Sequence, residues 1–282
     1  MKIRNDRLYD GATAVPLRDT PNKSGGLTGG KPKFLVIHYT AGGSASGSLN
    51  HMANAAARAS AHLVIGRDGA VTQMGKFDEK LWHAGRSSWK GFDGLNAHSV
   101  GIELANWGKL GGGPSAWKTW VGRPVADELA IAAAHKHEPG VIRGWEIYPE
   151  PQVEACIAAS RAICEEYGLG PAEIIGHDDI SPGRKSDPGP AWDMAAFRAA
   201  VFGQASDEPA EGPDEDPRWT VAASALNMRA GAGIGNEVVG KLARGEQVVP
   251  IEQPGTWWLV ARIVDGEEDA AGWVHSHYLQ PA

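Results

Sequence analysis

Short apolar runs, each bounded by turn residues, alternate with helix-like patterns over the first 202 residues. Residues 33–42, KFLVIHYTAG, form such a run and predict a buried strand. Residues 98–106, HSVGIELAN, alternate apolar with other positions and predict a second strand. Residues 62–74, HLVIGRDGAVTQM, predict a hairpin with Arg-Asp-Gly at its turn. Strands that alternate with helices indicate an α/β fold, with a mixed central β-sheet flanked by helices.

Helical signals lie between and after these strands. Residues 151–167 begin with a proline, carry apolar residues at helical spacing and stop at Gly168. Residues 190–202 are bounded by a proline and a glycine in the same way. Shorter helices are expected over 48–60 and 126–137.

The pattern changes after residue 202. Residues 203–217, GQASDEPAEGPDEDP, are poor in apolar side chains and rich in Pro, Asp and Glu, which predicts an extended linker. Beyond it, short strand-like segments such as TWWLVARI and AAGWVHSHYL alternate with turns and predict a small all-β barrel. The expected organisation is a domain over 1–202, the linker, and a second domain over 218–282.

Composition and charge exclude several classes of protein. The 282 residues are 42% hydrophobic and 22% charged, as in ordinary globular proteins, and no apolar run is long enough to span a membrane. Much of the net charge of −7 comes from the linker, which has six acids and no base. Because no basic stripe is present, nucleic-acid binding is not expected.

The compartment is predicted from two features. The N-terminus, MKIRNDRLYDG, lacks the apolar core of a signal peptide. Cys156 and Cys164 lie eight residues apart in an expected helix, too far for a disulfide, so both are expected to be reduced core residues. Synthesis in the cytoplasm is the expectation, unless a holin, lysis or another route releases the protein to the cell wall.

Candidate metal ligands come from distant parts of the chain. His38 lies near the C-terminal end of the first predicted strand, where α/β sheets place their chemistry. His177 and Asp187 lie in IIGHDDISPGRKSDPGP, residues 174–190. Two histidines and one carboxylate with an open fourth position are typical of catalytic zinc. Lys185 is expected to face the same site as Asp187, because residues i and i+2 of an extended segment share a side.

Glu103 is the candidate for proton transfer. It lies among apolar residues in the second predicted strand, and burial there would raise its pKa toward the working pH of a general base or acid. The alternative is a glutamate on an edge strand that faces solvent.

Five motifs now carry a family resemblance. They are FLVIHYTAG, SAHLVIGRDGAVTQM, LWHAGRSSW, NAHSVGIELAN and IIGHDDISPGRKSDPGP, and they span residues 33–190. This part of the chain resembles the type 2 N-acetylmuramoyl-L-alanine amidases, zinc enzymes related to phage lysozyme-amidases and animal peptidoglycan recognition proteins. The C-terminal residues 219–280 resemble the bacterial SH3-like domain, which often binds cell-wall peptides.

The resemblance implies a reaction and roles for residues. The family hydrolyses the amide between the lactyl group of N-acetylmuramic acid and L-alanine of the stem peptide. His38, His177 and Asp187 would bind Zn²⁺, with Glu103 as the catalytic carboxylate. Lys185 would steady the developing oxyanion.

Four further residues are candidates for substrate binding. His62 would either donate to a substrate carbonyl or support the hairpin. His83, with Trp82, is expected to shape the sugar or peptide site, and Asn96 to position the strand that carries Glu103.

The remaining aromatic and imidazole side chains have alternatives. Residues 105–150 are rich in Gly and Trp and could form a lid or wall of the substrate groove. The tryptophans of this segment would stack on saccharide rings or, as we favour, anchor it to the core; they include Trp107, Trp117 and Trp120. Solvent exposure is expected for two pairs of histidines, His135 and His137 on a helix and His275 and His277 on the barrel surface.

The expected function is hydrolysis of peptidoglycan or muropeptides by a monomer, as a phage, prophage or bacterial wall lysin. The tethered SH3-like domain favours the lysin, because a wall-binding domain raises local substrate concentration. A cytoplasmic amidase that recycles soluble anhydro-muropeptides is the alternative. A non-catalytic peptidoglycan-binding protein is a third possibility, which the complete ligand set argues against.

Overall fold

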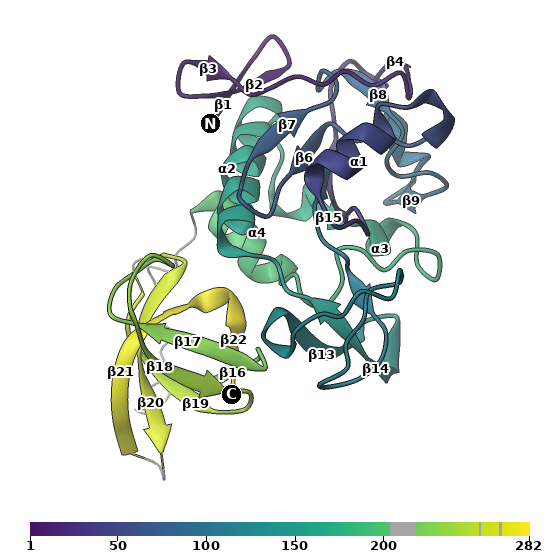
Figure 1. Cartoon of the computed structure of the whole chain (residues 1–282). Helices are drawn as coiled ribbons and strands as arrows, with labels where there is room; N and C mark the ends of the chain where they lie inside the picture. Colours follow the sequence, from purple (N-terminus) through teal and green to yellow (C-terminus); the bar gives the residue numbers. More distant parts are fainter. Residues whose placement is uncertain (204–217, 254, 265–266) are drawn as a thin grey trace.

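The computed structural model describes residues 1–203, 218–253, 255–264 and 267–282. The expected linker, residues 203–217, lies outside the described residues except for Gly203. Figure 1 shows a larger unit of sheet and helices and, beside it, a smaller unit built of strands. This arrangement confirms the expected fold class.

A five-stranded mixed sheet forms the centre of the larger unit. Four neighbouring strands are parallel, and β7 is antiparallel to β6, as predicted for the hairpin over 62–74. The parallel strands are almost wholly apolar because both faces of the sheet are covered. In order across the sheet the strands are β15 (Ile174–Gly176), β5 (Phe34–Tyr39), β11 (Ser99–Leu104), β6 (Leu63–Ile65) and β7 (Val71–Gln73).

Helices cover the sheet on both sides. The long helix α2 (Glu150–Tyr167) and α4 (Met194–Phe202) share one core with alternate residues of β5 and β11, and α1 (Ala45–Met52) packs on the other side with β6. Gly168 and Gly203 end their helices in the left-handed region, as predicted.

Two helix boundaries differ from the expectation. The last helix begins at Met194 and not at residue 190, because the side chain of Asp193 caps it by accepting from the backbone N–H groups of Ala195 and Ala196. The expected helix over 48–60 begins earlier, after the cap Ser44, and is followed by the 3-10 turn η1 (Ala55–Ala57). Both buried cysteines are free and lie on α2, as predicted.

The insertion between β11 and α2 is a three-stranded sheet, and the helix expected over 126–137 is wrong. A 3-10 turn, η3 (Asp127–Leu129), leads directly into β13 (Ala130–His135). β13 pairs with β14 (Glu138–Glu146), which also pairs with β12 (Lys109–Leu110). The alanines of β13 favour a helix in isolation, but tertiary packing overrides this propensity because buried tryptophans of the insertion cover the sheet.

Small strands complete the larger unit. An N-terminal meander packs on α2, and further short strands border the loop over 82–98. These strands are β1 (Lys2–Arg4), β2 (Arg7–Asp10), β3 (Thr13–Ala14), β4 (Lys23–Gly26), β8 (Glu79–Leu81), β9 (Ser88–Trp89) and β10 (Phe92–Asp93). Short helical turns complete the set: η2 (Leu95–Ala97), η4 (Pro171–Glu173) and α3 (His177–Ile180).

The smaller unit is a curled, seven-stranded, antiparallel sheet around its own core, as predicted for the C-terminal residues. Its strand order is β18-β17-β21-β20-β19-β16-β22. The elements are β16 (Trp219–Val221), β17 (Ala225–Arg229), β18 (Val238–Ala243), β19 (Gln247–Glu252), β20 (Trp257–Val264), β21 (Glu267–His275), η5 (Ser276–Tyr278) and β22 (Leu279–Pro281). Within the described ranges, no helix has the length and apolar character needed to cross a bilayer.

Candidate metal centre and active site

Two neighbouring parallel strands carry His38 and Glu103 to the same face of the sheet. The two residues are register partners in the β5–β11 pair. The residues on either side of them, such as Ile37 and Ile102, point to the opposite face and join the core beneath α2. Strand alternation therefore places one imidazole and one carboxylate next to each other, at the C-terminal ends of the strands.

Three candidate ligand atoms converge beside this pair. His177 opens α3 directly after β15, which pairs with β5, and Asp187 follows the turn after α3. The Nδ1 atoms of His38 and His177 lie 2.8 Å apart. The Oδ2 atom of Asp187 lies 3.0 Å from the first nitrogen and 2.8 Å from the second. All three residues are buried.

This donor set fits zinc. One ion can bond three atoms so close together, since zinc takes imidazole nitrogen and carboxylate oxygen at about 2.0–2.2 Å. Among the described residues, the set is the one group of three such side chains with its ligand atoms clustered. The ligands come from one strand and from one segment far along the chain, with His38 and His177 separated by 139 positions, so folding must precede assembly of the site.

Hydrogen bonds behind the ligands fix both imidazoles. The Nε2–H of His177 donates to the backbone oxygen of Ala84 at 3.1 Å. The Nε2 atom of His38 lies 3.0 Å from Nδ1 of His83, whose own Nε2 lies 3.2 Å from the backbone oxygen of Ser99. When Nε2–H is the donor in each of these bonds, the Nδ1 lone pairs of His38 and His177 are free to bind a metal.

The electrostatics keep the ligands ready for a cation. The pKa of His38 is lowered to about 4, mainly by burial and next by the neighbouring His177. Its imidazole is therefore neutral at physiological pH. Burial alone would raise the pKa of Asp187, but the adjacent imidazoles of His177 and His38 outweigh burial and hold that pKa below its ordinary value. Neutral imidazole and ionised carboxylate are the forms that bind metal.

Glu103 has the environment expected of a proton-transfer group. Its Oε2 atom is buried and has no hydrogen-bond partner among the described residues. Burial, followed by repulsion from Asp187, raises the pKa of Glu103 to about 8, and the positive charge of Lys185 partly offsets this. A carboxyl group with such a pKa can both accept and donate a proton near neutral pH.

Lys185 is exposed on the loop between α3 and Asp187. Its charge lowers the pKa of both Glu103 and His38, so its field reaches the site. Lys185 also lines a cavity of about 170 Å³ between its loop and the insertion, together with Lys109 and Trp145.

His62 and His83 lie behind the site, and the structure favours the supporting role for His62. His62 is fully buried: its Nδ1 accepts from the N–H of Gly101, and its Nε2–H donates to the backbone oxygen of Glu79. These bonds leave no proton for a substrate, so His62 supports the sheet. His83 is also buried and contacts His38 through its Nδ1 atom, and its expected role in shaping the substrate site stays a prediction.

Asn96 and Trp82 flank the same segment. The Oδ1 atom of Asn96 accepts from the N–H groups of His83 at 3.0 Å and Ala84 at 2.6 Å. Asn96 therefore holds the segment behind both metal-ligating imidazoles and not the strand of Glu103, which corrects that expectation. The half-buried Trp82 donates its indole N–H to Ser24, and its contact with substrate stays a prediction.

The tip of the insertion, residues 135–137, contacts α3. No motif in the sequence indicated this contact. His135 is buried and not exposed, because its Nε2 pairs with Asp178 at 3.0 Å. Lys136 pairs with the other oxygen of Asp178 at 2.9 Å, and His137 contacts the backbone oxygen of the same residue. Since Asp178 follows the candidate ligand His177, the β13–β14 hairpin is a brace for the candidate metal centre.

Removing the Asp178 carboxylate should destabilise the protein more than removing Lys136. Asp178→Ala leaves the buried His135 without its partner, and we expect the free energy of unfolding to fall by about 3 kcal/mol. Lys136→Ala, the matched control, removes a half-exposed partner and should cost less than about 1 kcal/mol. Urea unfolding of both variants measures the difference, and equal losses would contradict the brace.

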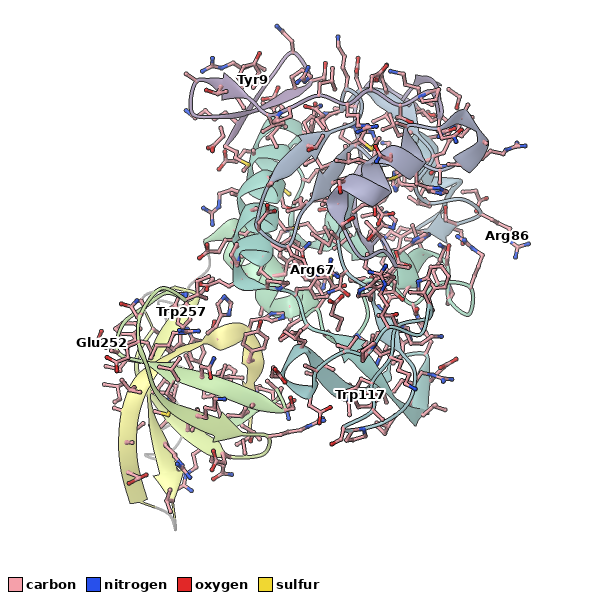
Figure 2. All side chains as sticks on the ribbon, viewed as in Figure 1. Tyr9, Arg67, Arg86, Trp117, Glu252 and Trp257 are labelled. Atoms are coloured by element: carbon pink, nitrogen blue, oxygen red, sulfur yellow. The ribbon has the colours of Figure 1, made fainter. Side chains whose placement is uncertain are left out.

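The tryptophans of the insertion divide between two roles. Trp117, labelled in Figure 2, is buried against Leu110 and Ala130, and the half-buried Trp107 joins this cluster, so anchoring is confirmed for both. Trp120 is 71% exposed, and its indole N–H donates to the backbone oxygen of Ala41, just after β5. One hydrogen bond therefore holds Trp120 while most of its ring faces solvent, and the expectation that it packs on the core is wrong.

His275 and His277 are not free barrel surface as expected. His275 is buried, and the Nε2–H of His277 donates to the backbone oxygen of Ala191 at 2.9 Å. His277 therefore lies where the smaller unit contacts the larger one. Sequence periodicity could not reveal this burial, since it arises between two separately folded units.

Comparison with known proteins agrees with this architecture. Residues 28–190 match the family model described as N-acetylmuramoyl-L-alanine amidase (Amidase_2), and residues 224–280 match the bacterial SH3 domain. The chain is 34% identical over 144 residues to 1,6-anhydro-N-acetylmuramyl-L-alanine amidase AmpD of Escherichia coli K12, covering 51% of this chain and 59% of that protein. It is 30% identical over 168 residues to N-acetylmuramoyl-L-alanine amidase AmiD of the same organism, covering 57% and 50%.

Solved structures include similar chains. A crystal structure of a Se-Met AmpD derivative has a TM-score of 0.48 and 24% identity, covering 71% of this chain and 98% of that one. The Escherichia coli AmiD complex with anhydro-N-acetylmuramic acid-L-Ala-D-gamma-Glu-L-Lys has a TM-score of 0.44 and 26% identity, covering 68% and 61%. The chain spans less than two thirds of the length of the curated relatives that it matches. Because the family model covers more than half of the 282 residues, the chain belongs to the N-acetylmuramoyl-L-alanine amidase family.

Proposed function

We propose that this chain hydrolyses the amide between N-acetylmuramic acid and L-alanine in peptidoglycan or muropeptides, with zinc held by His38, His177 and Asp187. The observation that carries the proposal is the convergence of three ligand atoms within 3.0 Å of one another, beside a buried glutamate with a raised pKa. Membership of the amidase family and the names of the relatives AmpD and AmiD, both N-acetylmuramyl-L-alanine amidases, support the same reaction.

The side chains divide the chemistry between them. Zinc bound at this site would supply a positive charge that polarises the scissile carbonyl and makes water a better nucleophile at neutral pH. Glu103 accepts a proton from the attacking water and later donates it to the leaving amine of L-alanine. Lys185 offsets the negative charge that develops on the carbonyl oxygen. His83 holds His38 in the orientation and tautomer that this arrangement requires.

The full chain is proposed to act on the cell wall. We assign residues 1–202 to the amidase domain, 203–217 to a linker and 218–282 to a wall-binding SH3-like domain, supported by the bacterial SH3 match over 224–280. A second module that binds the wall would raise the effective concentration of substrate. In this proposal the protein is synthesised in the cytoplasm, acts as a monomer and reaches the wall upon lysis.

A specific observation favours the alternative substrate. The AmpD relatives carry a name that specifies 1,6-anhydro-N-acetylmuramyl-L-alanine, so soluble anhydro-muropeptides are the second candidate. Comparing initial rates on intact sacculi and on a soluble anhydro-muropeptide at equal concentrations of stem peptide separates the two. A wall lysin should turn over sacculi at least as fast, and a recycling amidase should strongly prefer the soluble substrate.

Product mass and metal dependence test the reaction itself. Purified full-length protein should release a stem peptide with a free L-alanine amine from a muropeptide, as measured by mass spectrometry. A chelator should stop the release, and added zinc should restore it. Cleavage at another bond, or cleavage indifferent to the chelator, would rule out the proposed reaction.

Lys185→Ala should lower turnover by about a hundredfold while leaving bound zinc unchanged. The reason is that a cation near the developing oxyanion is worth about 3 kcal/mol in comparable sites. Lys118→Ala is the matched control, because Lys118 is an exposed lysine on the insertion. Rates on a soluble muropeptide and metal analysis provide the two measurements, and an unchanged rate in Lys185→Ala would remove this residue from the mechanism.

A further inference from the structure

The smaller unit contacts the loop that carries the metal ligand Asp187, and we propose that the SH3-like domain is a brace that sets zinc affinity as well as a wall-binding module. Tyr278 and His277 are the positioning residues. This inference rests on the proposed zinc site, and it assigns the domain a role that persists on a soluble substrate.

A chain of two hydrogen bonds links the SH3-like domain to the metal loop. The hydroxyl of Tyr278, in η5, donates to the backbone oxygen of Tyr148 at 3.0 Å. The hydroxyl of Tyr148 donates in turn to the backbone oxygen of Pro188 at 2.8 Å. Tyr148 is fully buried, and Pro188 is bonded directly to Asp187. Tyr148 therefore connects Tyr278 of the SH3-like domain with the loop that carries Asp187.

A second contact holds the other end of the same loop. The Nε2–H of His277 donates to the backbone oxygen of Ala191 at 2.9 Å. The buried ring of Trp192 lies between the two contacts, with its centroid 4.9 Å from that of Tyr148 and 6.2 Å from that of His277. Residues 188–192 are thus braced at both ends, directly after the metal ligand.

The loop depends on such partners because of its sequence. Residues 187–191 read Asp-Pro-Gly-Pro-Ala, and two prolines remove two backbone N–H donors from the segment. The carbonyl oxygens of a buried segment must still find donors. At Pro188 and Ala191 the donors are the side chains of Tyr148 and His277. These neighbouring residues therefore help to determine the position of the loop.

The contact between the two units extends beyond this loop. Trp257, labelled in Figure 2, is buried and donates its indole N–H to Glu150 at the start of α2. The hydroxyl of Ser224 donates to the backbone oxygen of Asp127, in the insertion, at 2.7 Å. Figure 1 shows the SH3-like domain beside the end of the larger unit that carries α4 and β13. Several separate anchors therefore set the position of Tyr278 and His277.

Zinc affinity of full-length variants tests the brace. Tyr278→Phe removes one hydroxyl and keeps the ring, and we expect the zinc Kd, from competition with a chromogenic chelator, to rise about three- to tenfold. Tyr9→Phe is the matched control, since Tyr9 lies on the N-terminal meander (Figure 2). Saturating zinc should restore turnover of Tyr278→Phe on a soluble muropeptide, because the variant loses affinity for the metal and keeps every residue of the reaction itself.

Two further variants keep the test decisive. His277→Ala removes the Ala191 bond alone and should also weaken zinc binding, so it replaces Tyr278→Phe if that variant does not fold. Tyr148→Phe combined with Tyr278→Phe should raise the Kd less than the product of the single effects, because both changes act on one chain of bonds.

The outcomes distinguish this inference from the proposed function. If the parent protein binds no zinc, the metal site fails. If the parent binds zinc, and Tyr278→Phe and His277→Ala have the Kd of Tyr9→Phe, the metal site stands and the brace is overturned.

Discussion

Replacing Asp187 with alanine is expected to abolish tight zinc binding and to reduce turnover by a factor on the order of 10³. The variant leaves two imidazoles, whose Nδ1 atoms lie 2.8 Å apart, without the carboxylate that contacts both. Two neutral ligands hold zinc poorly, and the positive charge that would polarise the scissile amide is lost with the metal. Metal analysis after dialysis and stem-peptide release from a soluble muropeptide measure the two effects.

Asp93→Ala provides the control for this experiment. Asp93 is exposed on β10 and does not belong to the ligand cluster, so its loss should change neither zinc content nor rate. Retention of one equivalent of zinc and full activity by Asp187→Ala would show that the metal, if any, is held elsewhere. Loss of both properties in Asp93→Ala would instead indicate a general loss of folded protein.

The candidate ligand set was accessible to sequence analysis because the chemistry of metal binding restricts the choice of side chains. His38 ends an apolar run, and His177 and Asp187 lie in one Pro- and Gly-rich loop, so pattern and side-chain type agree. The strand over 98–106 was predictable from alternation, which also placed Glu103 away from the core beneath α2. The left-handed Gly168 was predictable because it follows a helical pattern directly.

The supporting residues were not accessible in the same way. His83 and His135 have no periodic signal that distinguishes a buried, hydrogen-bonded imidazole from an exposed one. Their partners, His38 and Asp178, lie 45 and 43 positions away in the sequence. Local propensity was misleading over 126–137, because its alanines favour a helix while packing in the insertion selects a strand. Contacts between the two units leave no pattern of apolar and polar positions in the sequence of either unit.

These supporting contacts converge on one segment. The insertion holds the His177 end through Asp178, and the SH3-like domain holds the Asp187 end through Pro188 and Ala191. A carboxylate on a loop is a weakly positioned ligand unless its neighbours restrict it. In the proposed arrangement the two braces restrict the loop on both sides, while the sheet positions His38 and Glu103 directly.

Glu103→Gln is expected to reduce turnover by about 10²- to 10⁴-fold and to leave zinc content unchanged, because the amide keeps the shape of the side chain but cannot accept the proton from water. Glu128→Gln, at an exposed position of the insertion, should retain full rate. Initial rates and metal analysis compare the pair. An active Glu103→Gln enzyme would assign proton transfer to another group.

The same substitution has a predictable effect on stability in the metal-free protein. The pKa of Glu103 is raised from 4.5 to about 8, first by burial, so the folded protein keeps a proton that the unfolded chain releases between these values. The free energy of unfolding must then fall as the pH rises through this interval. Gln carries no such proton, and Glu103→Gln should be more stable than the parent at pH 9, with the gain shrinking toward pH 5. Urea unfolding of both proteins in chelator at several pH values measures this, and a gain that is independent of pH would show that Glu103 is ionised throughout.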